Sequence, residues 1–199
     1  MYQSLNLFMF TEYFGYISGI LILLSFVPYL FSIFTHRTKP ERASWLIWAL
    51  LGSILFWTQL AKGAGSSLWL PGVQTIGDLL IFIVSIKYGI GGFLKRDIIA
   101  FSFTIMALVL WYITQEPAVA LFIAILIDAS GGVLTIMKSL EYPNSESIIS
   151  WVLTVLAGLF GALAVGQWNF ILLAFPIYIF LICSAILGSV IWARKRSLG

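Results

Sequence analysis

Residues 35–48 read THRTKPERASWLIW and stand between two long apolar runs. Five charged or titratable side chains fall within seven residues there, in a chain of which only 10% is charged. Residues 138–151 read KSLEYPNSESIISW and again hold a proline, a later serine and a final tryptophan. An offset of 103 residues pairs Pro40 with Pro143, Ser44 with Ser147 and Trp48 with Trp151. This similarity predicts a duplicated unit, in which a short loop precedes a helix that begins at the serine of each copy.

The composition indicates a membrane protein. Of the 199 residues, 61% are hydrophobic and 16% aromatic, and the mean hydropathy is +1.03. A soluble domain of this size cannot keep so much apolar surface from water, because surface-to-volume scaling places much of the chain at the surface. The lipid bilayer is therefore the expected partner. The single cysteine, Cys183, lies in an apolar run and cannot form an internal disulfide.

Seven apolar segments approach the roughly 20 residues that a helix needs to cross a bilayer. Helices satisfy their backbone hydrogen bonds internally, as the hydrocarbon core requires. The segments are expected at 13–34, 43–61, 68–87, 98–113, 117–137, 147–165 and 168–192. The predicted fold is an all-α membrane protein with seven transmembrane helices. A first three-helix repeat spans 1–92, a linker helix spans 93–114, and a second, parallel repeat spans 115–199.

The basic residues orient these segments. With seven spans, ten of the eleven Lys and Arg residues fall on one side of the membrane and only Lys62 on the other. Cytoplasmic loops carry such an excess, so we expect the N-terminus outside and the C-terminus in the cytoplasm, in a bacterial inner (plasma) membrane. The basic side chains are expected to contact lipid headgroups. No nucleic-acid partner is expected, despite the net charge of +3.

The arrangement resembles the PQ-loop superfamily, which includes the SWEET sugar transporters. The resemblance rests on residues 27–57, VPYLFSIFTHRTKPERASWLIWALLGSILFW, and on the grouping of helices as three, one and three. Members carry Pro-Gln on the first helix of each repeat, where this chain has Pro28-Tyr29 and, in its second half, Gly131-Gly132. The resemblance implies a central site between two parallel repeats. It leaves the substrate open, since members carry sugars, amino acids or vitamin precursors and include a cargo receptor.

Two carboxylates lie near the middle of predicted spans, Asp78 in the third and Asp128 in the fifth. A charge at that depth costs roughly 2.5–3.5 kcal/mol on insertion scales, so such residues face a bundle interior or a watery cavity. Either carboxylate could couple protons, or be a neutral group that only hydrogen-bonds a neighbouring helix. Gln74 precedes Asp78 by one helical turn and shares its face. Gln74 and Asp78 are therefore predicted to bind substrate.

Aromatic side chains on the second helix of a repeat can stack on a substrate in SWEET-like proteins, which implies such a role for Trp48 and Trp151. Anchoring at the membrane interface is an equal alternative for both. Trp45 is expected to serve as an anchor or in gate packing. The seventh segment offers only Tyr178 and Cys183 in the region that corresponds to Asp78. Tyr178 is therefore predicted to bind substrate there, and that side of the site is expected to be more hydrophobic.

Three residues are predicted hinges. Pro28 loosens the first helix because proline removes a backbone hydrogen bond, and the resemblance implies a hinge there. Gly131 and Gly132 are expected to act as the hinge in the second half. Gly15 and Gly19 form a GxxxG pattern that packs either inside the bundle or between two copies, which leaves a homo-oligomer open.

The sequence thus predicts a transporter of a small polar solute that works by alternating access, with or without protons coupled through Asp78 or Asp128. The alternative is a non-transporting membrane receptor or scaffold on the same fold. No catalytic constellation, cofactor or metal site is predicted, because the one histidine, His36, has no second ligand near it in sequence. Deep acidic residues without a basic partner disfavour an anionic solute.

Overall fold

The computed structural model describes residues 2–61, 69–92, 94–114, 117–165 and 170–197. Over these residues the chain forms seven α-helices and no strand, so the all-α prediction is confirmed. The helices are α1 (Tyr2–Phe34), α2 (Arg42–Ala61), α3 (Trp69–Tyr88), α4 (Lys95–Thr114), α5 (Pro117–Glu141), α6 (Ile148–Ala164) and α7 (Phe170–Ser197). Each corresponds to one expected segment. Leu68 and Trp168, the expected starts of the third and seventh segments, lie outside the described residues.

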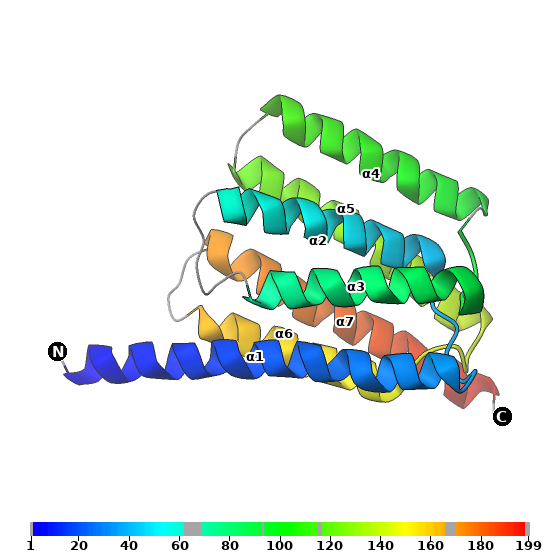
Figure 1. The fold of residues 1–199 in the computed structure, drawn as a ribbon, viewed down its shortest axis with the longest axis horizontal. Helices are drawn as coiled ribbons and strands as arrows, with labels where there is room; N and C mark the ends of the chain where they lie inside the picture. The colour runs from blue at the N-terminus through cyan, green and yellow to red at the C-terminus, as the bar shows by residue number, and fades with distance from the viewer. Residues whose placement is uncertain (1, 62–68, 93, 115–116, 166–169, 198–199) are drawn as a thin grey trace.

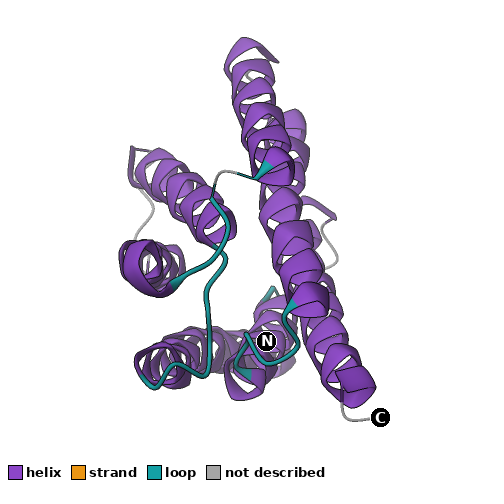
Figure 2. Cartoon of the chain, turned by 90° about the vertical axis from the view of Figure 1, so that its right-hand side faces the viewer, coloured by secondary structure: helices purple, strands orange, loops and turns teal. Residues whose placement is uncertain are grey.

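The helices lie side by side along one axis and alternate in direction (Figure 1). The odd-numbered helices run one way and the even-numbered helices run the other. Residues 35–41, 89–92 and 142–147 gather at the end of the bundle where α7 also finishes, which we call the loop end. Figure 2 looks onto this end and shows its connections in teal.

Helix packing follows one scheme twice. In the first group α3 packs against both α1 and α2, and in the second group α7 packs against both α5 and α6. Within the described residues the backbones of α1 and α2 do not approach each other closely, nor do those of α5 and α6, so the third helix of each group lies between the other two. Across the groups, α1 packs on α6 and α2 packs on α5, while α4 lies outside against α5 and α2. Exchanging the two groups reproduces the same contacts among their six helices, whereas the contacts of α4 have no counterpart.

The α1–α6 contact is the most intimate helix pair that joins the two groups, and small residues form it. The Ser18 hydroxyl donates a 2.8 Å hydrogen bond to the Ala157 carbonyl oxygen. A Cβ atom at Gly15 would lie 3.9 Å from Ala164 Cβ, whereas one at Gly19 would have no atom within 4 Å. The first glycine of the GxxxG pattern therefore packs inside the bundle against α6.

The helices expose apolar side chains and bury polar ones, the reverse of the arrangement in a soluble protein. Every helix exposes large apolar side chains, with examples in Val27, Leu50, Ile76, Ile99, Val133, Ile149 and Leu181. Serine, threonine and aspartate side chains are buried instead, among them Ser25, Asp78, Ser85 and Asp128. Soluble monomers rarely expose apolar surface on this scale. By length and composition, two described helical stretches could cross a membrane, Thr11–Phe34 and Pro176–Ser197. These features favour a membrane protein.

Candidate functional site

The first turns of α2 and α6 are built alike. Before α2, Glu41 Oε2 accepts a 2.7 Å hydrogen bond from the Ser44 backbone N–H and lies 2.9 Å from the Ser44 hydroxyl oxygen. Before α6, Ser147 Oγ accepts bonds from the Ser150 backbone N–H at 3.4 Å and from its hydroxyl at 2.9 Å. In both helices a side chain just before the first turn satisfies a backbone donor that would otherwise be unpaired.

These matched caps show that the offset of 103 residues is wrong at the helix starts. Helix α2 begins at Arg42, so Ser44 is its third residue and not its beginning. The caps correspond at an offset of 106, which pairs Ser44 with Ser150, Trp45 with Trp151 and Trp48 with Thr154. The prolines caused the error, because Pro40 directly precedes its cap residue whereas Pro143 stands four residues before its own.

A central cavity lies between the two groups of helices. It encloses about 600 Å³ of space that no atom fills, part of it open to the outside. Its described lining comes from α1, α2, α3, α5, α6 and α7. Five residues singled out from the sequence meet there: Gln74 and Asp78 from α3, Trp48 from α2, Asp128 from α5 and Trp151 from α6. Residues far apart in the sequence are thus brought to one site.

The two carboxylates have different surroundings. Both side chains are buried, Asp78 with 5% and Asp128 with 6% of its surface exposed. Tyr178 is not part of the cavity lining, but its hydroxyl donates a 2.8 Å hydrogen bond to Asp128 Oδ2. The Tyr178 hydroxyl therefore orients the Asp128 carboxylate, and direct binding of substrate by Tyr178 stays a prediction. Around Asp78, the described residues supply no hydrogen bond of this kind.

Helix α7 supplies an apolar wall. Its described contribution to the cavity is Ile179, Ile182, Cys183 and Ile186. Helix α3 supplies an amide and a carboxylate one turn apart. The third helices of the two groups thus face the cavity with unlike chemistry, as the compositions of the third and seventh segments indicate.

Four aromatic side chains, which we call the aromatic tetrad, form part of the cavity wall and contact one another in a closed circuit. They are Tyr29 from α1, Trp45 and Trp48 from α2, and Trp151 from α6. The ring centroids are 5.0 Å apart for Tyr29–Trp45, 5.0 Å for Trp45–Trp48, 6.2 Å for Trp48–Trp151 and 6.5 Å for Trp151–Tyr29. All four distances lie within the range that aromatic pairs favour. The tetrad therefore joins the two groups across the cavity.

Hydrogen bonds fix two of the indole rings. Trp48 Nε1–H donates to the Asp128 carbonyl oxygen at 3.1 Å. Trp151 Nε1–H donates to Glu146 Oε2 at 2.7 Å. Trp45 and Trp151 are buried in the bundle, so anchoring at the membrane interface does not describe them. No sequence pattern assigns Tyr29 a place in this cluster, whereas the three-residue spacing of Trp45 and Trp48 already places them on one helix face.

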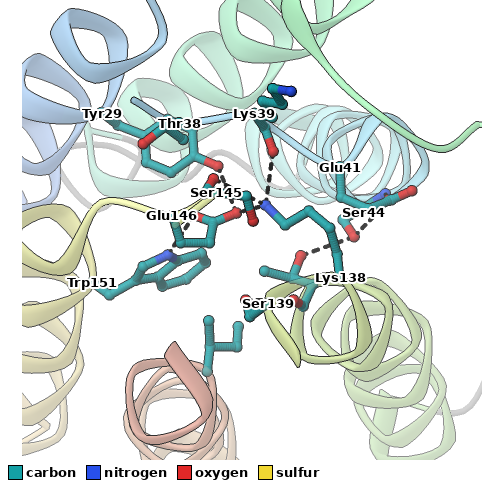
Figure 3. A network of polar contacts seen from close by, with 12 residues as sticks. Tyr29, Thr38, Lys39, Glu41, Ser44, Lys138, Ser139, Ser145, Glu146 and Trp151 are labelled. Atoms are coloured by element: carbon teal, nitrogen blue, oxygen red, sulfur yellow. Dashed lines mark hydrogen bonds and ion pairs between the residues drawn. The ribbon is translucent and has the colours of Figure 1, made fainter. Parts of the chain in front are cut away.

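A buried polar network lies beside the tetrad at the loop end (Figure 3). Lys138, at the end of α5, forms an ion pair with Glu146, and both side chains are almost fully buried. The Lys138 ammonium group also donates a 2.8 Å hydrogen bond to the Lys39 carbonyl oxygen. Glu146 Oε1 accepts a 3.1 Å hydrogen bond from the Tyr29 hydroxyl. Glu146 is thus bonded to two members of the tetrad, Tyr29 and Trp151.

The same network joins the two loops directly. The Lys39 backbone N–H donates a 2.9 Å hydrogen bond to the Ser145 carbonyl oxygen. Residues 35–41 of one group and 142–147 of the other are therefore bonded through the backbone and through Lys138. Together with the tetrad, these contacts join the two groups at the loop end.

The expectation that the basic residues contact lipid headgroups is wrong for Lys138, whose side chain is 0% exposed. Its location at a helix end fits the charge bias of a cytoplasmic loop, but its ammonium group points inward. The sequence gives no sign of this, because a salt bridge to Glu146 depends on how residues 142–147 fold.

Two arginines near this end also bond to protein groups. The Arg42 guanidinium donates to the carbonyl oxygens of Ser85 at 2.8 Å, Gly89 at 2.7 Å and Gly91 at 3.0 Å. These carbonyls belong to the end of α3 and the turn that follows it. Arginine thereby satisfies acceptors that a helix end leaves unpaired.

Arg194 makes the corresponding link in the second group. Its guanidinium donates to the Pro143 carbonyl oxygen at 3.3 Å and to the Glu146 carbonyl oxygen. In each group an arginine therefore ties the end of the third helix to the region where the second helix starts.

Glu41 is a further buried carboxylate that the sequence analysis missed. Its side chain is 0% exposed, and among the described residues its Oε1 atom has no hydrogen-bond partner. Burial raises the pKa of Glu41, opposed by its hydrogen bonds from Ser44. Asp97 raises this pKa further and Lys138 lowers it. Glu41 thus combines a capping role with a charge in a poorly solvated place.

The predicted hinge residues lie at close helix contacts. The Gly131 carbonyl oxygen accepts a 2.7 Å hydrogen bond from the Ser44 hydroxyl. A Cβ atom at Gly131 would lie 2.8 Å from Trp48 Nε1, and one at Gly132 would lie 2.7 Å from Ile182 Cγ1. Both glycines therefore allow α5 to approach its neighbours. Pro28 lies inside the continuous helix α1, and a hinge role for all three stays a prediction.

Comparison with known proteins adds no relative: no protein-family model, curated protein or solved structure matches the chain. The resemblance to the PQ-loop superfamily therefore rests on residues 27–57 and the grouping of the helices.

Proposed function

We propose that the protein is a membrane transporter that carries a small polar solute by alternating access between two parallel three-helix repeats, α1–α3 and α5–α7. The observation that carries this proposal is the position of Asp78 and Asp128. One carboxylate comes from each group, and both line the cavity between the groups. Ionisable residues at membrane depth mark solute or proton pathways in membrane proteins.

Seven membrane spans are part of the proposal. The shortest helix, α6, has 17 residues, which falls within the range of about 17–25 that a span requires. In this proposal the alternating helix directions take the chain across the bilayer seven times. The apolar side chains that the helices expose would contact lipid. The odd helix α4 allows α1 and α5 to run in the same direction, as parallel repeats about an axis along the membrane normal require.

Alternating access requires that one end closes while the other opens. In this proposal the tetrad and the buried network keep the cavity closed at the loop end, and we assign this arrangement to one of the two transport states. Among the described residues, the two groups are bonded there by Lys39 with Ser145 and Lys138, by Tyr29 with Glu146, and by Ser44 with Gly131 and Thr135. Breaking a small set of contacts lets rigid groups rock about the cavity without unfolding either one.

Proton coupling through Asp78 or Asp128 belongs to the same proposal. Protonation removes a charge from the cavity and thereby changes which packing of the two groups is favoured. The hydrogen bond from Tyr178 distinguishes Asp128 from Asp78, so the two carboxylates are not equivalent partners for a proton.

The test is uptake of labelled solutes into proteoliposomes that contain the purified full-length chain. Sugars, amino acids, nucleosides and vitamins are screened at pH 5.5 and 7.5, with Asp78→Asn as the test variant and the exposed Glu141→Gln as its matched control. The proposal expects uptake of one solute class that Glu141→Gln retains and Asp78→Asn loses. A solute that binds the purified protein but never enters the vesicles would instead support a receptor or scaffold.

A further inference from the structure

The acidic side chains of the cavity have no basic partner in its described lining. Its described lining holds two carboxylates and no lysine, arginine or histidine. The buried cation Lys138 lies outside that lining and pairs with Glu146. A buried carboxylate is costly unless it is protonated or paired with a cation. Either protons or the solute itself must therefore supply positive charge between Asp78 and Asp128.

The aromatic tetrad lies in the same cavity wall and is suited to a cation. A positive centre within about 6 Å of an indole centroid is attracted by the ring face, and desolvation strengthens the effect. The 3.1 Å hydrogen bond from Trp48 to the backbone of Asp128 places that indole beside an acidic residue. Trp151 is the neighbour of Trp48 in the circuit, with its centroid 6.2 Å from that of Trp48. Carboxylate and aromatic groups are thus available to one ligand.

The remaining lining selects among cations. Ile179, Ile182 and Ile186 form an apolar wall that accommodates methyl or methylene groups and offers nothing to a hydrated metal ion. A carboxylate on the ligand would meet two acids and no base. The Gln74 amide supplies one uncharged polar group for a hydroxyl.

We propose that the solute is a small organic monocation without an acid group, an alkylated ammonium compound, whose positive centre is held by Asp78, Asp128 and the indole faces of Trp48 and Trp151. This inference rests on the proposed function in taking the cavity as the solute site. It goes further in naming the chemical class and the groups that recognise it.

The experiment compares three probes on the purified full-length chain by calorimetry at pH 7.5. Choline carries the quaternary ammonium group, 3,3-dimethylbutan-1-ol is its uncharged carbon isostere, and betaine adds a carboxylate to the same cation. We expect choline to bind about tenfold or more tightly than either comparison compound, as a desolvated cation–aromatic contact and two carboxylates imply. Equal affinity for choline and the isostere, or no choline binding at all, overturns the inference.

Variants of the cavity residues test which side chains bind the cation. Asp78→Asn and Asp128→Asn should each weaken choline binding about tenfold, and Trp48→Leu several-fold. Trp192→Leu, at an exposed tryptophan beside Arg196 on α7, is the matched control and should leave the affinity unchanged. Unchanged affinity in all three cavity variants would overturn the assignment. The wild-type comparison of choline with its isostere remains decisive if a variant does not fold.

The inference and the proposed function fail in different ways. If choline binds as expected but does not enter proteoliposomes, the result contradicts transport and supports the cation site. If an uncharged solute is taken up and the protein does not prefer choline to its isostere, the result contradicts the cation site and supports transport.

Discussion

The Tyr29 hydroxyl donates a hydrogen bond to Glu146 Oε1 over 3.1 Å, between residues 117 positions apart in the sequence. This bond joins α1 of the first group to the loop before α6 of the second. The same carboxylate pairs with Lys138 and accepts a bond from Trp151. Glu146 is therefore the residue at which the aromatic tetrad and the polar network of the loop end meet.

Replacing Lys138 by methionine should be strongly destabilising. The Glu146 carboxylate would stay buried without its cationic partner, and removing one member of a buried pair costs about 3–5 kcal/mol. The measurement is the free energy of unfolding in detergent, followed by circular dichroism. The double variant K138M/E146Q should recover part of the loss, because it removes the unpaired charge as well.

The exposed Lys195 provides the control for that prediction. Lys195→Met changes the same side chain at the solvent-exposed end of α7, where substitutions shift stability by only about 0.5 kcal/mol. If Lys138→Met were no more destabilising than Lys195→Met, the buried ion pair would not stabilise the bundle.

Substitutions at two glycines distinguish the effect of close helix packing from that of helix propensity. A Cβ atom at Gly158 in α6 would lie 2.9 Å from the Phe180 backbone nitrogen and 3.0 Å from its Cα, while one at Gly188 in α7 would meet no atom within 4 Å. Gly158→Ala should therefore lower the free energy of unfolding by about 1–3 kcal/mol. Gly188→Ala should leave it unchanged or raise it by up to about 1 kcal/mol. Equal effects of the two substitutions in thermal unfolding would contradict the α6–α7 packing.

Glu41 should make stability depend on pH. Its pKa is raised by burial above the ordinary value of 4.5, so between 4.5 and the raised pKa the folded protein binds more protons than the unfolded chain. The free energy of unfolding contributed by this group is therefore highest below pH 4.5 and falls as the pH rises through the folded pKa.

The check is unfolding of wild type, Glu41→Gln and the exposed Glu12→Gln between pH 4 and 7. Glutamine keeps an oxygen for the Ser44 cap but cannot ionise, so Glu41→Gln should decline less with rising pH than wild type. Glu12→Gln should follow wild type. A decline that is identical in all three proteins would show that Glu41 does not contribute.

Tyr29→Phe should favour opening of the loop end. The substitution removes the hydroxyl that bonds the charged Glu146, an interaction worth about 1.5–3 kcal/mol, and leaves the ring in the tetrad. Labelling of Cys183 by an impermeant thiol reagent from the loop side should become about tenfold faster or more. Tyr142→Phe alters an exposed tyrosine of the adjacent loop and should not change the rate. Equal rates in both variants would contradict the role of this bond.

Hydropathy was sufficient to predict the helices, because each apolar run needed only a count of its length and the turns between runs are short. It also identified Asp78 and Asp128, since a carboxylate inside an apolar run is visible without a structure. The repeat offset was misassigned by three residues because Pro40 and Pro143 stand at different distances from their caps. Only the bonds of Ser44 and Ser150 to their cap residues reveal the true correspondence.

The polar network could not be predicted in the same way. Lys138 lies at the end of an apolar helix, where a lysine usually faces the membrane surface, and its burial follows from the fold of residues 142–147. The aromatic tetrad depends on contact between α1 and α6, and no local pattern specifies that contact. Long-range packing thus accounts for what the sequence analysis missed.

The central claim is that the cavity opens in turn to both faces of the membrane. Cys183, the only cysteine of the chain, lines that cavity, so a charged impermeant thiol reagent can be applied from each side of sealed vesicles, with Cys183→Ser as the blank. Ser25→Cys in the Cys183→Ser background supplies a second thiol in the lining if the native one reacts slowly. Alternating access predicts labelling of the cavity thiol from both sides. Labelling from one side only, at both positions, would contradict it.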